Sequence, residues 1–203
     1  MSHTSDLDFG SIIGIVNNVI AYSSHYQPFA DANSEISLHS KDISKCQIYN
    51  KYDNLSTHYI NGVFYGLKWQ CVEFSRRYLI LNHNITFTNV VNAYNIFELE
   101  YFTLLDNSID NSIVNSIVPI YKYINGSNIR PHIGSLLIWN KHDDDITGHV
   151  AVITKINLDN IEIGEQNYKN IKWSNNYSRT LPFKDDNGFH IIDTHIIGWI
   201  NII

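Results

Sequence analysis

The sequence predicts an α+β fold in which N-terminal helices pack on a C-terminal antiparallel β-sheet. In the first half, apolar residues recur at helical spacing between residues 72 and 81. In the second half, short apolar segments are bounded by turn residues, a pattern typical of strands. The connection at residues 157–159 is too short for the crossover that parallel strands require, so antiparallel neighbours are expected. Helices followed by antiparallel strands define the α+β class.

The composition indicates a single globular domain. With 203 residues and 44% hydrophobic content, we expect one domain over residues 1–203, with residues 1–8 as a tail. The net charge of −6 argues against nucleic-acid binding, which needs a basic face. Residues 1–6 lack a basic signal region and the apolar run at 12–20 is too short to span a bilayer, so a soluble, cytoplasmic protein without membrane contact is expected. There is no phosphate-binding glycine loop and no zinc motif, so we expect no cofactor and no metal.

Cys71 lies in the first turn of the first predicted helix, which ends near residues 82–84. Glu73, Arg76 and Arg77 have the three- and four-residue charge spacing that helices favour. Unpaired backbone N–H groups and the helix dipole favour an anion in the first turn, so a thiol there is a candidate nucleophile if a histidine base lies elsewhere. The alternative is a small buried hydrophobic residue, as most free cysteines are.

A second helix is expected from Asn89, as N-cap, through residue 105. Ala93 and Ile96 keep helical spacing in this segment. Residues 106–116 are rich in Asn and Ser and predict a break. Before the first helix, residues 11–22 predict a short strand or edge segment, followed by a long irregular region with turns at Pro28 and Asp53.

Short apolar segments in the second half predict strands. They are residues 134–139, 148–155, 160–167, 189–192 and 196–200. If the hairpin between the second and third of these is centred at Asn157, Ala151 lies opposite Ile163 and His149 lies opposite Glu165.

His149 and Glu165 are therefore a candidate acid–base pair. A carboxylate in that position could orient the imidazole and stabilise its charged form. Asn167 is the competing orienting group. A structural histidine and a surface carboxylate are the alternative interpretations, and both stay open at this point.

A helical cysteine, then a strand histidine, then an acid or amide on the adjacent strand is the order found in papain-like cysteine amidohydrolases, and in the CHAP group in particular. Several motifs resemble, more closely, the amidase domain of glutathionylspermidine synthetase/amidase. They are Trp-Gln-Cys-Val-Glu-Phe at 69–74, Thr-Gly-His-Val-Ala at 147–151, Glu-Gln-Asn at 165–167 and Ile-Gly-Trp at 197–199, with further matches at 9–14, 21–24 and 136–139. These matches span nearly the whole chain.

The resemblance implies a papain-like/CHAP fold and a hydrolase that cleaves the amide between a glutathione glycine and spermidine. It implies Cys71 as nucleophile, His149 as base and acid, and Glu165 as the partner of His149. Gln70 would help to hold the oxyanion. The substrate-binding residues that it implies are Gln70, Arg76, Val90, Val91, Asn92, Ala93 and Asn167. The family usually has Gly-Met where this chain has Val91-Asn92, so substrate contacts are expected to differ there.

Three other functions fit the same residues. A CHAP-type peptidoglycan amidase or endopeptidase would use the same groups on a cell-wall substrate. A catalytically silent module would bind a polyamine conjugate without turnover. An acyl-transfer enzyme would resolve the acyl-enzyme with an amine in place of water. In each case the expected partner is a small molecule or wall fragment, and the sequence does not predict the oligomeric state.

Overall fold

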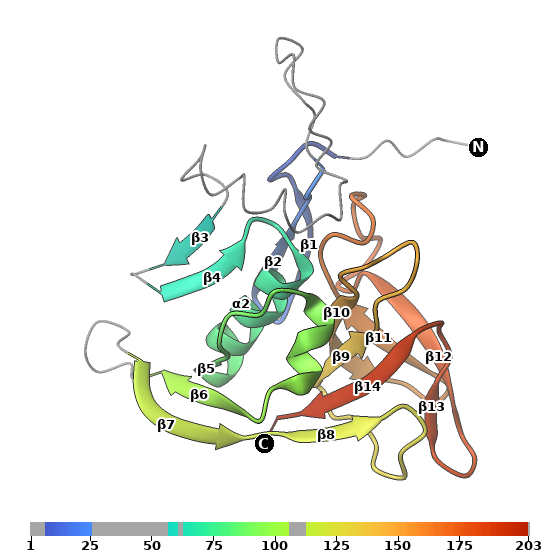
Figure 1. Ribbon diagram of the computed structural model, residues 1–203. Coiled ribbons are helices and arrows are strands. Elements are labelled where there is room, and N and C mark those ends of the chain that lie inside the picture. Colours follow the sequence, from blue (N-terminus) through green and yellow to red (C-terminus); the bar gives the residue numbers. More distant parts are fainter. Residues whose placement is uncertain (1–6, 26–56, 61–62, 106–112, 203) are drawn as a thin grey trace, which may run out of the picture.

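The computed structural model of the chain describes residues 7–25, 57–60, 63–105 and 113–202 (Figure 1). Strands dominate these residues, and the helices among them are α2 (Cys71–His83) and the short 3₁₀ helix η1 (Ala93–Glu98). The predicted layer of N-terminal helices is thus only partly observed. The first predicted helix is present with the expected ends, whereas most of the remaining described N-terminal half forms strands.

One large antiparallel sheet forms the C-terminal half (Figure 1). Its strands lie in the order β13 (Phe189–Ile191), β12 (Arg179–Asp185), β11 (Asn160–Gly164), β10 (His149–Ile156), β9 (Leu136–Trp139), β14 (Ile196–Asn201) and β8 (Tyr121–Ile124). The five segments predicted as strands all contribute to it. The sequence analysis did not predict β8 and β12.

Both faces of this sheet are buried. One face, which includes Ile138 and Val150, packs with Phe74 and Leu79 of α2 in one hydrophobic cluster. The alternate residues form a second cluster on the other face, where Leu181, Phe189 and Ile191 of β12 and β13 cover Leu137, Ala151 and Trp199. Because successive side chains of a strand point to opposite faces, near-continuous apolar strands such as β9 indicate burial on both sides.

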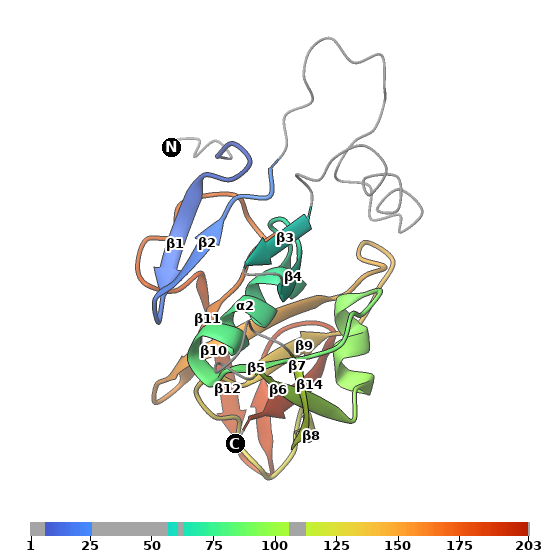
Figure 2. The same cartoon turned by 90° about the vertical axis from the view of Figure 1, so that its left-hand side faces the viewer.

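The N-terminal segment forms a hairpin instead of a single strand. Strands β1 (Ile12–Val16) and β2 (Val19–Tyr22) are joined by Asn17 and Asn18, both with positive φ. Two such residues are the signature of a type I′ turn, whose twist matches that of a hairpin. Figure 2 shows this hairpin beside α2, which contacts β2. A second hairpin, of β3 (Thr57–Ile60) and β4 (Val63–Leu67), leads into α2.

The second predicted helix is wrong in type and extent. Its N-cap is Asn92 instead of Asn89, the 3₁₀ helix η1 ends at Glu98, and the residues after it form strand β6 (Tyr101–Leu105). Strand β6 lies between β5 (Ile85–Thr86) and β7 (Ile113–Pro119) in a three-stranded sheet. Pairing with strands distant in sequence thus overrides the local helical spacing, which is a weak prior by comparison. Part of the predicted break at 106–116 is likewise strand β7.

The predicted register of the β10–β11 hairpin is off by two residues. Ile153 lies opposite Ile163, and Val152 lies opposite Gly164. The prediction placed the turn at Asn157, but the turn spans residues 157–160, where the N–H of Asn157 donates to the carbonyl of Asn160. A slip of two residues leaves each side chain on its expected face. Strand β11 ends at Gly164, so Glu165 lies beyond the end of the ladder. His149 and Glu165 are therefore not paired across the two strands.

Several expectations lie outside the described residues, namely those on residues 1–6, Pro28 and Asp53. Within the described ranges, no helix is long and apolar enough to cross a membrane.

Candidate active site

Cys71 is the first residue of α2 and is buried. Gln70 caps the helix in an extended conformation, and its carbonyl accepts the first helical hydrogen bond, from the N–H of Phe74 at 3.1 Å. The first N–H groups of a helix have no partner within it, and Cys71 lies in this first turn, where the sequence predicts it. The side chain of Cys71 lies close enough to His149 to raise the pKa of the imidazole. A residue from the helix start and one from the sheet are thereby brought together.

His149 is the first residue of β10 and lies between Cys71 and Glu165. Its Nε2 is 2.9 Å from Oε2 of Glu165, which leaves Nδ1 for the Cys71 side. Burial alone would lower the pKa of His149, but the charges of Cys71 and Glu165 and hydrogen bonds to both raise it to about 10. The imidazole therefore favours its charged form, as in a thiolate–imidazolium pair. Of the two orienting groups that the sequence left open, Glu165 is the one that contacts His149.

Glu165 is buried and its carboxylate accepts hydrogen bonds on both oxygens. Oε1 accepts from the hydroxyl of Ser178 and from Nε of Arg179, each at 2.8 Å. Burial alone would raise the pKa of Glu165, but the hydrogen bond and charge of His149 and the charge of Arg179 lower it to about 2. The carboxylate is therefore ionised at neutral pH.

Asn167 does not contact His149 but holds Gln70. Its Nδ2 donates to Oε1 of Gln70 at 2.6 Å, and its Oδ1 accepts from the hydroxyl of Ser24 at 2.7 Å. With Oε1 of Gln70 occupied, the Nε2 amide group of Gln70 is the end left to donate. The chain Ser24–Asn167–Gln70 thus fixes which end of the Gln70 amide is left to donate.

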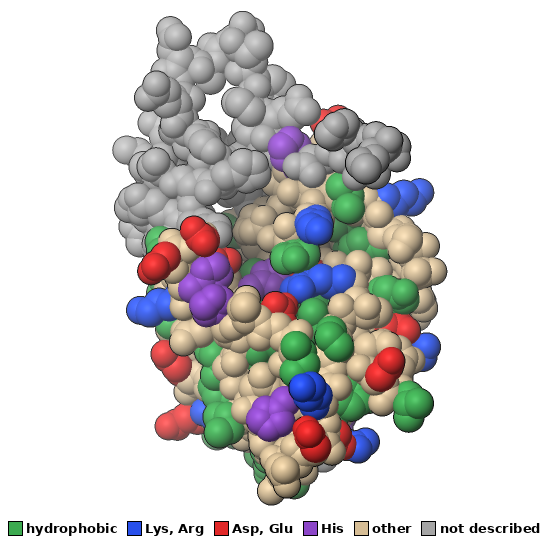
Figure 3. All heavy atoms as spheres, turned by 90° about the vertical axis from the view of Figure 1, so that its right-hand side faces the viewer, with side chains coloured by type: hydrophobic (Ala, Val, Ile, Leu, Met, Phe, Trp, Pro, Cys, Tyr) green, Lys and Arg blue, Asp and Glu red, His purple; other side chains and the backbone are tan. Residues whose placement is uncertain are grey.

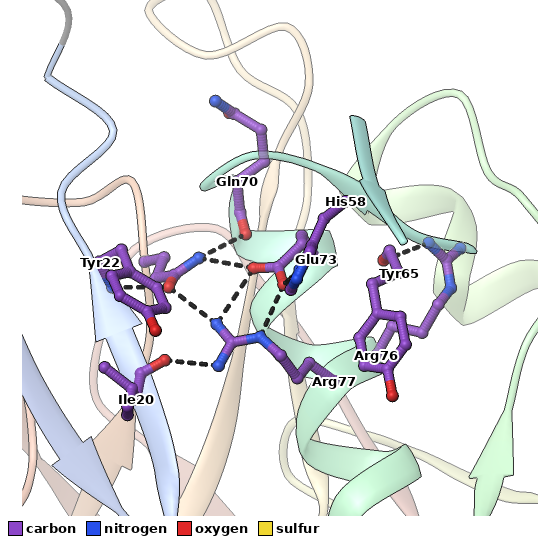
Figure 4. Close-up of polar contacts among 9 residues, drawn as sticks. Ile20, Tyr22, His58, Tyr65, Gln70, Glu73, Arg76 and Arg77 are labelled. Atoms are coloured by element: carbon purple, nitrogen blue, oxygen red, sulfur yellow. Dashed lines mark hydrogen bonds and ion pairs between the residues drawn. The ribbon is translucent and has the colours of Figure 1, made fainter. Parts of the chain in front are cut away.

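A buried ionic cluster lies next to the backbone carbonyl of Gln70 (Figure 4). Glu73 accepts hydrogen bonds from His58 Nδ1 at 2.7 Å, from Arg77 Nε at 2.6 Å and from Gln166 Nε2 at 2.9 Å. Gln166 also donates to the carbonyl of Gln70 at 3.2 Å, and Arg77 donates to the carbonyl of Ile20. Gln166 directly follows Glu165, the residue that contacts His149. The side-chain amide of Gln166 therefore links the start of α2 to the segment that contacts His149.

Arg76 is buried and points away from this cluster, towards Tyr65 (Figure 4). Its guanidinium donates to the carbonyls of Tyr65 at 2.8 Å and Thr88 at 3.3 Å and lies over the ring of Phe87. Burial lowers its pKa to about 10, against the charge of Glu73. Among the described residues, the Nε–H of Arg76 has no hydrogen-bond partner.

The segment 90–93 lies beside the start of β10. Val91 is 71% exposed, whereas Asn92 and Ala93 are buried. The N–H of Ala93 donates to the carbonyl of Thr147 at 3.0 Å, two residues before His149. All the residues that the sequence predicts for the site therefore belong to segments next to Cys71 or His149, although Arg76 and Ala93 are covered.

Sequence reasoning missed most of the groups that support these residues. Arg179 and Ser178 belong to or adjoin β12, a strand that was not predicted. Glu73 and Arg77 were noted only as helix-compatible charges, and their burial has no local signal. Gln166 lies inside the Glu-Gln-Asn motif at 165–167, which could have drawn attention to it.

The described surface carries both signs of charge. On the face drawn in Figure 3, acidic, basic and histidine side chains are interspersed. Among the described residues, no group of three His, Cys, Asp or Glu side chains is arranged to hold a metal ion.

The chain is similar to several known proteins. A bifunctional glutathionylspermidine synthetase/amidase of Escherichia coli (strain K12) is 32% identical over 206 residues, which cover 97% of this chain and 30% of that protein. A trypanothione synthetase of Crithidia fasciculata is 30% identical over 164 residues, covering 73% of this chain and 24% of that protein. The chain thus spans about a third or less of the length of these curated relatives. A solved structure, of Ly7917 with the hydrolysing product of MDP, matches 66% of this chain and 53% of its own at 13% identity, with a TM-score of 0.36.

The CHAP domain family model matches residues 62–167, which is more than half of the chain. The matched region contains Cys71, His149 and Glu165, the three residues that the structure brings together. The chain therefore belongs to the CHAP domain family.

Proposed function

We propose that the chain is a cysteine amidohydrolase that cleaves the amide bond of glutathionylspermidine, or of a related glutathione–polyamine conjugate, to glutathione and the polyamine. The observation that supports this most strongly is the series from Cys71 through His149 to Glu165. The proposed substrate is the one that the name of the Escherichia coli relative gives, a glutathionylspermidine synthetase/amidase.

In the proposed reaction, the Cys71 thiolate attacks the amide carbonyl and forms a tetrahedral intermediate. Backbone N–H groups at the start of α2 and the Nε2 group of Gln70 donate to its oxyanion. The imidazolium of His149 gives its proton to the departing amine, which breaks the C–N bond and leaves a thioester on Cys71. His149 then removes a proton from water, whose oxygen attacks the thioester and releases the glutathione carboxylate.

The remaining predicted residues are proposed to line the substrate site. Asn167 donates a hydrogen bond to the side-chain amide of Gln70 and acts on the substrate site through that amide. Exposed Val91 and its neighbours in the segment 90–93 adjoin the start of β10 and would contact the conjugate. The Nε–H of Arg76, which has no hydrogen-bond partner among the described residues, supplies one buried donor near Tyr65 and Thr88.

The test is to incubate the purified protein with glutathionylspermidine and to identify the products by mass spectrometry. We expect glutathione and spermidine, and we expect Cys71→Ala to abolish their formation. A thioester trapped at low pH on the Cys71 peptide would identify the acyl-enzyme. Cleavage of peptidoglycan fragments with no action on the conjugate would contradict the proposal and favour the cell-wall alternative. Binding of the conjugate without products would favour the silent module.

A further inference from the structure

Arg179 and Asp193 extend the hydrogen-bonded series beyond Glu165. Arg179, the first residue of β12, donates from Nε to Oε1 of Glu165 at 2.8 Å and lies 3.4 Å from Oε2 through Nη2. Its remaining terminal nitrogen, Nη1, donates to Oδ2 of Asp193 at 3.0 Å. The planar guanidinium therefore spans two carboxylates, a geometry that arginine fulfils and lysine does not.

Aromatic rings hold this guanidinium in place. The ring of Tyr168 lies 3.9 Å from its central carbon, and the ring of Trp139 lies 5.4 Å away. Nε1 of Trp139 also donates to Oδ2 of Asp193 at 3.3 Å, and the Trp139 ring meets His149 edge-on at 5.5 Å. Arg179 thus contacts two aromatic rings and two carboxylates, which restricts the usual freedom of an arginine side chain.

We propose that Arg179, anchored by Asp193, is a positioning residue for the His149–Glu165 pair: it fixes the Glu165 carboxylate in the plane that meets the imidazole and neutralises part of its charge. This inference rests on the proposed function, in which Cys71 and His149 are the reacting groups. Arg179 acts through Glu165 and is not itself a catalytic residue.

The charges around the imidazole define what Arg179 does. The titratable groups that face His149 are Cys71 from α2, Glu165 from the end of β11, and the more distant Tyr168. Arg179 faces Glu165, Tyr168 and Asp193. Removing its positive charge makes the surroundings of the imidazole more negative by one unit. A more negative surrounding holds the proton of the imidazole more tightly and disfavours a neighbouring thiolate.

The test measures the alkylation rate of Cys71 by iodoacetamide as a function of pH, read by mass spectrometry on the Cys71 peptide so that Cys46 does not interfere. In Arg179→Gln we expect the pH midpoint of the alkylation profile to rise, since the positive charge that offsets the Glu165 carboxylate is lost. In Arg179→Lys, which keeps the charge but loses the fork, we expect the midpoint to stay near that of the wild type.

Turnover supplies the second readout. With the fork lost, misplacement of the imidazole is expected to lower kcat about 100-fold in both variants while KM changes little. Asp193→Asn keeps Arg179 and weakens its anchor, so a smaller loss of kcat is expected, and this variant carries the test if Arg179→Gln does not fold. The matched control is Arg130→Gln. Arg130 is exposed and pairs with Asp185 at the other end of β12, so this variant removes the same charge without touching the site.

An Arg179→Gln profile that coincides with those of the wild type and Arg130→Gln, or that moves to lower pH, would overturn the inference. Alkylation requires no substrate, so the two proposals fail separately. If the wild type leaves glutathionylspermidine intact while the alkylation profile responds to Arg179 as described, the proposed function fails and the positioning role stands.

Discussion

Replacing Glu73 by Gln should strongly destabilise the protein, because Glu73 is the centre of the buried cluster in Figure 4. Each of its carboxylate oxygens accepts two hydrogen bonds. Oε1 accepts from His58 and Arg77, and Oε2 accepts from Arg77 and Gln166. The glutamine amide has the same size but only one acceptor oxygen. Its nitrogen is a donor and would face two donors in place of the second oxygen.

The expected cost follows from burial. The Glu73 side chain is fully buried and that of Arg77 is 5% exposed, so the variant leaves the guanidinium buried without its counter-ion. Breaking a buried pair in this way typically costs about 3–5 kcal/mol. For a chain of this size that corresponds to a fall in Tm of about 6–20 °C. Since native domains are stable by only about 5–15 kcal/mol, the effect should be large.

Guanidinium unfolding at pH 7, followed by tryptophan fluorescence, measures this loss. The matched control is Asp185→Asn, which removes a carboxylate from the pair of Asp185 with Arg130, two side chains at the surface that are 29% and 61% exposed. Exposed pairs contribute about 0–1 kcal/mol, so the control should unfold almost as the wild type does. A loss below about 1 kcal/mol for Glu73→Gln, or one equal to that of the control, would refute the argument.

The pH dependence of the same difference is a second check on the charge. Burial alone would raise the pKa of Glu73, but hydrogen bonds from His58 and Arg77 and the charge of Arg77 lower it below its ordinary 4.5. A carboxyl group with a lowered folded-state pKa stabilises the fold above its unfolded pKa and loses this effect as the pH falls. The advantage of the wild type over Glu73→Gln should therefore be full above about pH 4.5 and shrink below it.

Two further substitutions test the oxyanion site and the core. Gln70→Ala should lower kcat for glutathionylspermidine about 10²–10³-fold, as expected for a lost oxyanion donor, while Cys71 alkylation is unchanged; a kcat within about twofold of the wild type would remove Gln70 from that role. Gly14→Ala should destabilise by about 1–3 kcal/mol in urea, because its Cβ would overlap the buried ring of Trp173. Exposed Ile15→Ala serves as its control, and equal stabilities would contradict the overlap.

Local sequence patterns predicted the elements that carry the reacting groups. The apolar spacing and charge pairs after residue 70 placed Cys71 in the first turn of a helix, and α2 has those bounds. The apolar segment at residues 148–155, which turn residues bound, predicted strand β10 and its start near His149. These predictions succeed because the start of a helix, the extent of a strand and the face on which a side chain lies depend on residues only a few positions away along the chain.

Only the tertiary structure decided which groups meet. The turn at 157–160 shifts the hairpin register by two residues, and the contact of His149 with Glu165 arises beyond the end of the ladder. Spacing alone favoured Glu165 and left Asn167 as a competing candidate. Long-range packing assigns Asn167 to Gln70, 97 positions away, and Glu165 to His149.

The same reason explains the failures. Strand β6 takes its conformation from β5 and β7, so a helical spacing of apolar residues could not reveal it. Arg179 lies on a strand with alternating exposure and no local mark of function, and its role depends on two carboxylates, 14 positions away on either side. Hydrogen bonds and charges act through space, so the sequence determined which side chains were available and the fold determined their partners and their protonation.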